Sequence, residues 1–213
     1  MKIHFLGLFF LIFGISAALK AEFFLPGKLM PGIVSLKADN GLYLARCFGC
    51  GQASYKDSAG VHETNPYNPW SMWKLEIVGD KVALKSDNGN YLSRCNSCWS
   101  SASYKDAVFV HVGVLENNPW SLWKPQRLNN GKWAFKSDNG MYLTRCNSCV
   151  TNGAYADFAF THVSNLNGNP WSQWTLQYRF PLGPVSLQAD TGAYLLRCSK
   201  CGDSPYEVSA GIN

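Results

Sequence analysis

An internal repeat constrains the fold of this chain more than any other feature of its sequence. Four segments share one pattern: SLKADNGLYLARCFGC, ALKSDNGNYLSRCNSC, AFKSDNGMYLTRCNSC and SLQADTGAYLLRCSKC, which begin at Ser35, Ala83, Ala134 and Ser186. A second motif returns as NPWSMWKLEIV, NPWSLWKPQRL and NPWSQWTLQYR. The repeat length is about fifty residues, and units of that size bury a core by packing against their neighbours. The chain should therefore fold as an array of similar units.

Each unit has the residue pattern of β-strands. Apolar and polar residues alternate with period two, as around Val82, Leu84 and Leu92. Asp-Asn-Gly lies between two such stretches, and Asn-Gly at that place predicts a hairpin with a type I′ turn, which needs positive φ at both central residues. A third strand is expected at SAGVHE, AVFVHV and FAFTHV, and a fourth in the Trp-rich segment. Because no stretch of residues 22–213 has a sustained helical period, we predict an all-β fold.

The sequence leaves open how many units close the array. Units are expected at about residues 33–80, 81–131, 132–182 and 183–213. The fourth ends before any NPW segment, but residues 22–32 have the character of the stretch that precedes the fourth repeat. We therefore expect a single domain over residues 22–213, with three full units and a fourth completed by the N-terminal strand. The alternative is that one hairpin is extra.

At VALKSDNGNYLSR and GKWAFKSDNGMYLTR the sequence resembles the fascin family and the wider group of fascin-like and agglutinin-like β-trefoil modules. The resemblance implies a β-trefoil-like module of four-strand units. A trefoil takes three units, whereas this chain carries three and most of a fourth. Fascins bundle actin inside cells, and the N-terminal signal and paired cysteines described below depart from that pattern. Actin binding is therefore a disfavoured alternative.

Residues 1–21 have the pattern of an export signal. Lys2 precedes an apolar run from Phe5 to Ile15, and small residues such as Ala18 and Ala21 offer cleavage sites. The run is too short to span a bilayer comfortably, and no later stretch is long enough, so we expect a secreted, extracellular protein without a membrane span. The chain has 19 Lys and Arg against 14 Asp and Glu. This mild excess, without a basic block, argues against a nucleic-acid partner.

Eight cysteines form four Cys-x-x-Cys pairs. Export and the even count favour a disulfide within each pair, although the same spacing suits zinc ligation. We expect disulfides that pin the hairpin ends, and neither a metal nor another cofactor. The pairs are Cys47 and Cys50, Cys95 and Cys98, Cys146 and Cys149, and Cys198 and Cys201.

An arginine and an aspartate recur seven residues apart in every unit. Each Asp opens the hairpin turn and each Arg precedes the first cysteine, so a cross-strand or turn-anchoring interaction within one hairpin is expected. Contact with an anionic ligand is the alternative, because Arg is well suited to anionic groups. The arginines are Arg46, Arg94, Arg145 and Arg197, and the aspartates are Asp39, Asp87, Asp138 and Asp190.

Histidines occupy matching places on the third strand of three units, at His62, His111 and His162. A three-histidine metal site would need all three rings to point at the central axis, and the fourth unit has no histidine in YEVSAG. We therefore expect half-buried histidines that hydrogen-bond to the backbone.

Tryptophans form three Trp-x-x-Trp pairs, each behind Asn-Pro. Residues three apart on a strand point to opposite faces, so we expect Trp73, Trp123 and Trp174 in the core. The first Trp of each pair should then lie near the loops, where its face and a nearby Asn amide suit a pyranose. The candidate ligand-binding residues are Asn68, Trp70, Asn118, Trp120, Asn169 and Trp171, together with the four arginines.

These patterns favour binding over catalysis. The sequence contains no G-x-S-x-G, H-E-x-x-H or phosphate loop, and its most distinctive residues are repeated, whereas enzymes tend to have one special site. We expect no enzyme, but a lectin-like module whose repeated aromatic and Asn sites bind an extracellular glycan or polysaccharide. The alternative is a matrix protein that self-associates or binds a wall polymer.

Overall fold

The computed structural model describes residues 29–179, 195–199 and 208–212. The expected signal peptide over residues 1–21 lies outside the described residues. The chain divides into two compact units, Met1–Arg179 and Phe180–Asn213. In the described part, no helix is both long and apolar enough to cross a membrane.

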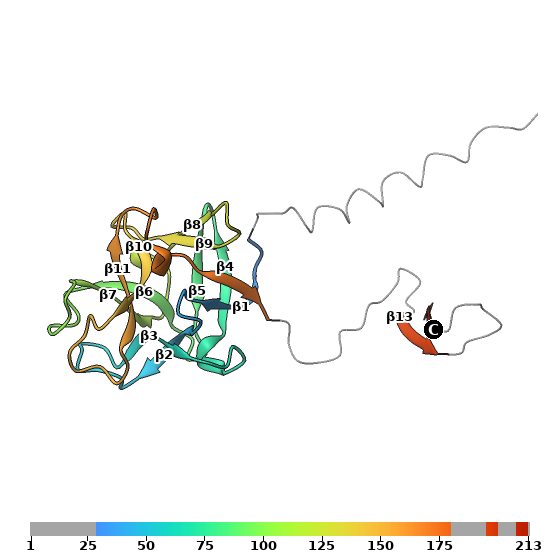
Figure 1. Ribbon diagram of the computed structural model, residues 1–213, viewed down its shortest axis with the longest axis horizontal. Helices are drawn as coiled ribbons and strands as arrows, with labels where there is room; N and C mark the ends of the chain where they lie inside the picture. The colour runs from blue at the N-terminus through green and yellow to red at the C-terminus, as the bar shows by residue number, and fades with distance from the viewer. Residues whose placement is uncertain (1–28, 180–194, 200–207, 213) are drawn as a thin grey trace, which may run out of the picture. The chain divides into compact units, whose positions relative to one another are not determined.

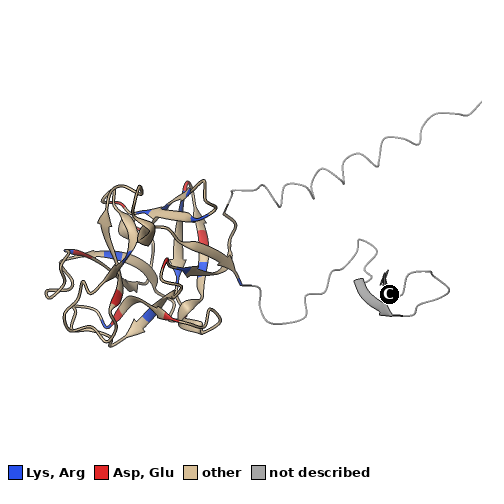
Figure 2. Cartoon of the chain, in the orientation of Figure 1, with Lys and Arg blue, Asp and Glu red and all other residues tan. Residues whose placement is uncertain are grey.

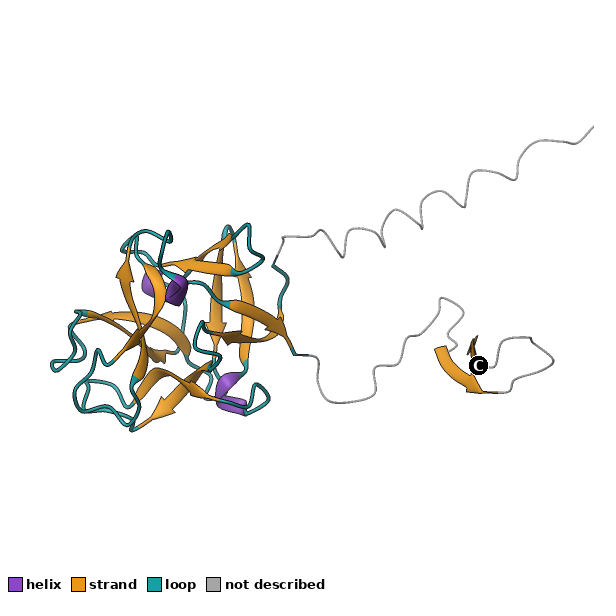
Figure 3. Ribbon diagram, in the orientation of Figure 1, coloured by secondary structure: helices purple, strands orange, loops and turns teal. Residues whose placement is uncertain are grey.

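Strands and loops build the first compact unit, and each repeat contributes four strands in the expected places (Figures 1 and 3). The all-β prediction is therefore confirmed for the described residues. The first repeat contains β1 (Gly32–Lys37), β2 (Tyr43–Phe48), β3 (Asp57–Glu63) and β4 (Trp73–Val78). The second contains β5 (Lys81–Lys85), β6 (Tyr91–Asn96), β7 (Asp106–Val112) and β8 (Lys124–Arg127). The third contains β9 (Trp133–Lys136), β10 (Tyr142–Asn147), β11 (Asp157–Val163) and β12 (Thr175–Tyr178).

Each NPW motif forms a short 3-10 turn before the fourth strand of its repeat. Proline suits the first position of such a turn because its fixed φ is already helical and its missing N–H would have no partner there. These turns are η2 (Pro69–Ser71), η3 (Pro119–Ser121) and η4 (Pro170–Ser172).

The first and fourth strands of the three repeats pair in a closed ring. β1 pairs with β4, β4 with β5, and β8 with β9. Isolated bridges join Val82 to Trp123 and Trp133 to Trp174. β12 pairs back to β1, with Val34 opposite Tyr178.

This closure differs from the expected array in which residues 22–32 complete a fourth unit. The first strand of the chain's first repeat already has β12 and β4 as its two neighbours. Residues 22–28 lie outside the described residues. Among the described residues, the strands that form the ring come from three repeats.

The second and third strands of each repeat form a hairpin, and the three hairpins meet one another. β2 pairs with β3, β6 with β7, and β10 with β11. One antiparallel residue pair then joins β3 to β7, another joins β7 to β11, and a third joins β11 to β3. Every repeat thus touches both of the others at this end of the ring.

The fourth repeat forms a separate sheet from β13 (Leu195–Ser199) and β14 (Val208–Ile212), which pair antiparallel. These strands correspond to the second and third strands of a repeat. Asp190 and Cys201 lie outside the described residues.

The Asp-Asn-Gly turns form the expected hairpins, but their type differs from the prediction. Gly41 has a φ of 86°, whereas Asn40 is not among the residues with positive φ. The Gly41 N–H donates to the carbonyl of Ala38, and the Asn40 side chain accepts from the Leu42 N–H. A type I turn followed by a left-handed glycine therefore replaces type I′.

One Trp from each pair fills the core, as expected from the spacing. Trp73, Trp123 and Trp174 are fully buried among the strands of the ring. Each indole Nε1–H donates across its own repeat to a carbonyl of the second strand, at Leu44, Leu92 and Leu143, over 2.9 to 3.0 Å. The hydrogen bond satisfies the polar end of a ring that the core otherwise surrounds with apolar groups.

Trp123→Ala should lower the free energy of unfolding by about 3 to 5 kcal/mol, because it leaves a cavity and an unpaired carbonyl at Leu92. Urea denaturation followed by circular dichroism measures this loss. Trp120→Ala is the matched control, since Trp120 is half-buried and should cost much less. Equal losses for the two variants would contradict the assignment of Trp123 to the core.

Candidate functional site

Disulfides close the three Cys-x-x-Cys pairs of the ring. Cys47–Cys50, Cys95–Cys98 and Cys146–Cys149 have Cα separations of 5.6 to 5.7 Å. The described residues contain no group of three or more His, Cys, Asp or Glu side chains that could hold a metal ion. The disulfide interpretation is confirmed for these three pairs, while the predicted Cys198–Cys201 pair lies partly outside the described residues.

Each disulfide also receives a hydrogen bond from the neighbouring repeat. The N–H of Ser54 donates to the carbonyl of Cys98 over 2.9 Å, and that of Ser103 to Cys149 over 2.8 Å. The circle is completed by the N–H of Ala154, which donates to the carbonyl of Cys50 over 2.7 Å. The disulfide loops therefore hold the repeats together as well as the hairpin ends.

The arginines bind aspartates of two repeats, and this corrects the prediction of pairing within one hairpin. Arg46 binds Asp57 on its own hairpin and Asp87 in the turn of the next repeat, each with an N–O distance of 2.7 Å. Arg94 binds Asp106 and Asp138 in the same way. Arg145 binds Asp157 and, at 2.7 Å, Asp39 of the first repeat. The turn aspartate thus pairs across the repeat boundary.

In this network, Arg46, Arg94 and Arg145 each donate three hydrogen bonds. Their side chains are between 13% and 18% exposed, and each guanidinium contacts two carboxylates. The hydrogen bonds from Arg46 lower the pKa of Asp87 to about 2, and those from Arg145 hold the pKa of Asp39 below its usual value. The geometry therefore uses Arg46, Arg94 and Arg145 to join neighbouring repeats, and their contact with an anionic ligand stays a prediction. The side chain of Arg197 lies outside the described part.

The histidines stack against tyrosines of the neighbouring repeat. Tyr155 lies on His62 with ring centroids 3.9 Å apart and planes 16° apart. The rings of Tyr55 and His111, and of Tyr104 and His162, are 4.2 and 4.1 Å apart. Within the described residues the Nδ1 atoms of the three histidines have no hydrogen-bond partner. The rings are half-buried as expected, but the predicted backbone bond is absent at Nδ1, and burial lowers the pKa of each histidine.

A pocket of about 340 Å³ lies where the first repeat meets the third. Its walls come from the first hairpin, from Trp70 beyond it, and from Tyr155 of the third repeat. Trp70 is 39% exposed and Phe48 is 65% exposed, so apolar rings face solvent at this place. The pocket is lined by Arg46, Cys47, Phe48, Cys50, His62, Glu63, Trp70 and Tyr155.

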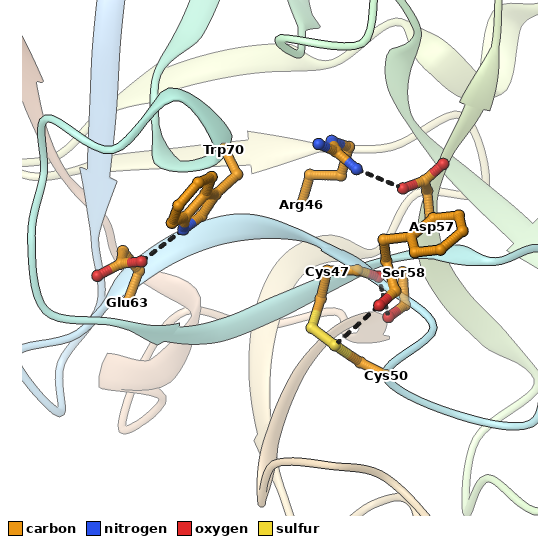
Figure 4. The surroundings of a disulfide bond; sticks show 8 residues. Arg46, Cys47, Cys50, Asp57, Ser58, Glu63 and Trp70 are labelled. Atoms are coloured by element: carbon orange, nitrogen blue, oxygen red, sulfur yellow. Dashed lines mark hydrogen bonds and ion pairs between the residues drawn. A yellow bond between two sulfur atoms is a disulfide. The ribbon is translucent and has the colours of Figure 1, made fainter.

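Glu63 places a carboxylate in this pocket. One carboxylate oxygen accepts from the Trp70 indole N–H (Figure 4). The other accepts from the backbone N–H groups of Thr64 and Asn65. Burial opposes ionisation, but these hydrogen bonds outweigh it and lower the pKa of Glu63 below its usual value. The carboxylate is therefore ionised at neutral pH and holds the Trp70 ring in place.

Glu63 and Phe48 were not recognised in the sequence, although departure from the repeat marks both. At the position of Glu63, the second and third repeats carry Val112 and Val163. At the position of Phe48 they carry Asn96 and Asn147. An arginine equivalent to Arg46 and a pair of cysteines occur in every repeat. The pocket of the first repeat is thus chemically distinct.

The other candidate residues differ from one another in their hydrogen bonds and burial. The side-chain amides of Asn118 and Asn169 each donate to two backbone carbonyls of their own loop. Asn68 accepts from Asn65 and also hydrogen-bonds to Glu63. Trp120 and Trp171 are half-buried. Of these candidates, the geometry therefore brings Trp70 to the pocket, and it uses the amides of Asn118 and Asn169 to shape loops.

Charged residues of both signs are interspersed along the strands and turns (Figure 2). A protein that tracks phosphates usually carries its Lys and Arg clustered on one face. The absence of a nucleic-acid partner stays a prediction.

No protein-family model matches the chain, and no curated protein matches it in sequence. A Polyporus squamosus lectin solved with the human-type influenza-binding epitope Neu5Aca2-6Galb1-4GlcNAc has a TM-score of 0.51 and 17% identity, over 71% of this chain and 50% of the lectin. The chain thus matches half the length of that lectin. A Culex quiquefasciatus salivary protein of the Cysteine and Tryptophan-Rich family has a TM-score of 0.52 and 16% identity, over 73% and 99% of the two chains.

Cytolethal distending toxin from Actinobacillus actinomycetemcomitans is also similar, with a TM-score of 0.54 and 12% identity, over 72% of this chain and 95% of that one. At identities this low, the structural matches show a shared all-β fold.

Asp87→Asn should lower the free energy of unfolding at pH 7 by about 2 kcal/mol, because Arg46 loses a charged partner from the next repeat. The pKa of Asp87 is about 2 in the folded chain and 3.8 in the unfolded chain. The difference in unfolding free energy between the native chain and the variant is therefore fully present above about pH 4. It should shrink as the pH falls from 4 to 2. Urea denaturation of both proteins across this range measures it.

Asp80→Asn is the control for this experiment, because the Asp80 side chain is 71% exposed and lies 3.4 Å from an equally exposed Lys124. It should change stability by less than about 1 kcal/mol. A destabilisation by Asp87→Asn that does not depend on pH would contradict the ionic account.

Proposed function

We propose that the protein is a secreted, lectin-like binding module that recognises a glycan at the pocket between the first and third repeats. Its fold neighbours include a lectin, and its pocket combines exposed aromatic rings with a fixed carboxylate. Three disulfides and the signal-like residues 1–21 support an extracellular location, because disulfides persist in oxidising compartments.

The repeat-by-repeat closure supports assignment of the ring to the β-trefoil fold that the sequence resemblance implies. Three four-strand repeats contribute equivalent strands, buried tryptophans and arginine pairs around the ring. Modules of this kind carry function on their loops while repeated contacts maintain the scaffold.

The surroundings of Trp70 carry the proposal. Its face is partly open to solvent, and its N–H is fixed by Glu63. An aromatic ring held in one orientation suits the apolar face of a pyranose, and the carboxylate of Glu63 offers a hydrogen-bond acceptor for hydroxyl groups. Because the ring is already ordered, binding costs less conformational entropy than it would with a mobile side chain.

The first repeat provides the principal site in this proposal, in place of several equivalent ones. Trp120 and Trp171 are more buried than Trp70, and valines stand in place of the carboxylate. We further propose that the module binds without catalysing a reaction.

Trp70→Ala should weaken glycan binding at least about tenfold, as expected for an aromatic side chain at the centre of a site. A glycan and polysaccharide array identifies ligands of the oxidised protein, and isothermal titration calorimetry then compares the variants. Trp120→Ala is the matched control and should bind like the native chain. Absence of binding to any glycan would refute the proposal, and assembly of the protein without sugar would then favour the matrix role.

A further inference from the structure

The charges around the pocket indicate more about its ligand than the aromatic rings alone. Arg46 is the nearest cation in its lining, but Asp57 and Asp87 both hold that guanidinium. Glu63 forms no ion pair with any of the described residues, and its oxygens accept hydrogen bonds from neutral N–H groups. Burial lowers the pKa of His62, so this ring is neutral at pH 7. Among the described residues that line the pocket, Glu63 is therefore an acidic side chain whose charge no ion pair compensates.

Aromatic rings share the lining of the pocket with this carboxylate. Trp70 binds it directly, Tyr155 and His62 form the stacked pair beside it, and Phe48 lies exposed in the same lining. The negative face of an aromatic ring attracts a cation, most strongly when the ring belongs to Trp. At Phe48 the chain shows this attraction itself, since the Lys56 ammonium lies 5.8 Å from the ring centroid.

We propose that the first-repeat pocket binds a positively charged ammonium group, with Trp70 and Tyr155 as aromatic contacts and Glu63 as the counter-ion. This inference rests on the same pocket as the proposed function and names the ligand class. An amino sugar with a free amine would satisfy both. A carboxylate-bearing sugar would be repelled by Glu63, whose hydrogen bonds with the backbone keep it ionised.

The equivalent places in the second and third repeats serve as comparisons for the first-repeat pocket. Each has the stacked His and Tyr, the disulfide and a tryptophan, but Val112 or Val163 in place of the carboxylate. An ammonium ligand should therefore bind with a stoichiometry of one per chain.

Calorimetry with four probes tests this: glucosamine oligosaccharide, N-acetylglucosamine oligosaccharide of equal length, sialyllactose and choline. The first two differ in charge on the same sugar backbone, and choline is an ammonium compound that is not a sugar. We expect the glucosamine oligomer to bind about tenfold more tightly than its acetylated counterpart, with sialyllactose weakest. Glu63→Gln should abolish the difference between the first two.

Glu116→Gln is the control, because it removes the same charge from an exposed loop of the second repeat and should leave the preference intact. Thermal denaturation shows whether each variant is folded. Trp70→Phe, which keeps an aromatic ring but loses the N–H, is the second variant if Glu63→Gln does not fold, and it should reduce the preference.

The outcomes separate this inference from the proposed function. Equal affinity for the two oligosaccharides would overturn the ammonium site and leave the lectin role standing. Choline binding that depends on Glu63, without binding of any sugar, would support the ammonium site and refute the lectin role. Failure of all four probes to bind would overturn the ammonium inference.

Discussion

The ion pairs between an arginine of one repeat and the turn aspartate of the next hold this structure together. Arg46 reaches Asp87, Arg94 reaches Asp138, and Arg145 returns to Asp39, so three pairs form a complete circle. Each guanidinium donates two nearly parallel hydrogen bonds to the turn carboxylate, as with Arg46 Nε and Nη2 on Asp87. Such bidentate pairs are directional as well as strong, and they fix the orientation of adjacent repeats.

The candidate site is a product of that closure. Tyr155 belongs to the third repeat, and it reaches His62 because Ala154 is hydrogen-bonded to Cys50 and Arg145 to Asp39. The remaining walls come from the first repeat. The scaffold repeats its contacts around the ring, and Glu63 stands in the first repeat where the next two have valine, so the chemical difference lies at one corner of a nearly symmetric frame.

Sequence periodicity was sufficient to predict the hairpins, the four strands of each repeat and the burial of Trp73, because these depend on local alternation and on spacing. Partners across repeats were not predictable in this way. Asp39 and Arg46 are seven residues apart on one hairpin, yet Asp39 pairs with Arg145, more than a hundred residues away, because the ring closes. Positions at which one repeat departs from the others were a usable signal of special contacts. Gly51 of the first repeat occupies the position that Trp99 holds in the second, and a Cβ at Gly51 would lie 2.1 Å from the Trp99 ring.

Two double-mutant cycles test whether charge pairs across the repeat boundaries join the repeats. The first combines Asp39→Asn with Arg145→Gln, and the second combines Asp39→Asn with Arg46→Gln, the partner on the same hairpin. Urea denaturation at pH 7 gives the coupling free energies. The account predicts about 2 kcal/mol for Asp39 with Arg145 and less than about 0.5 kcal/mol for Asp39 with Arg46. Coupling to Arg46 in place of Arg145 would contradict it.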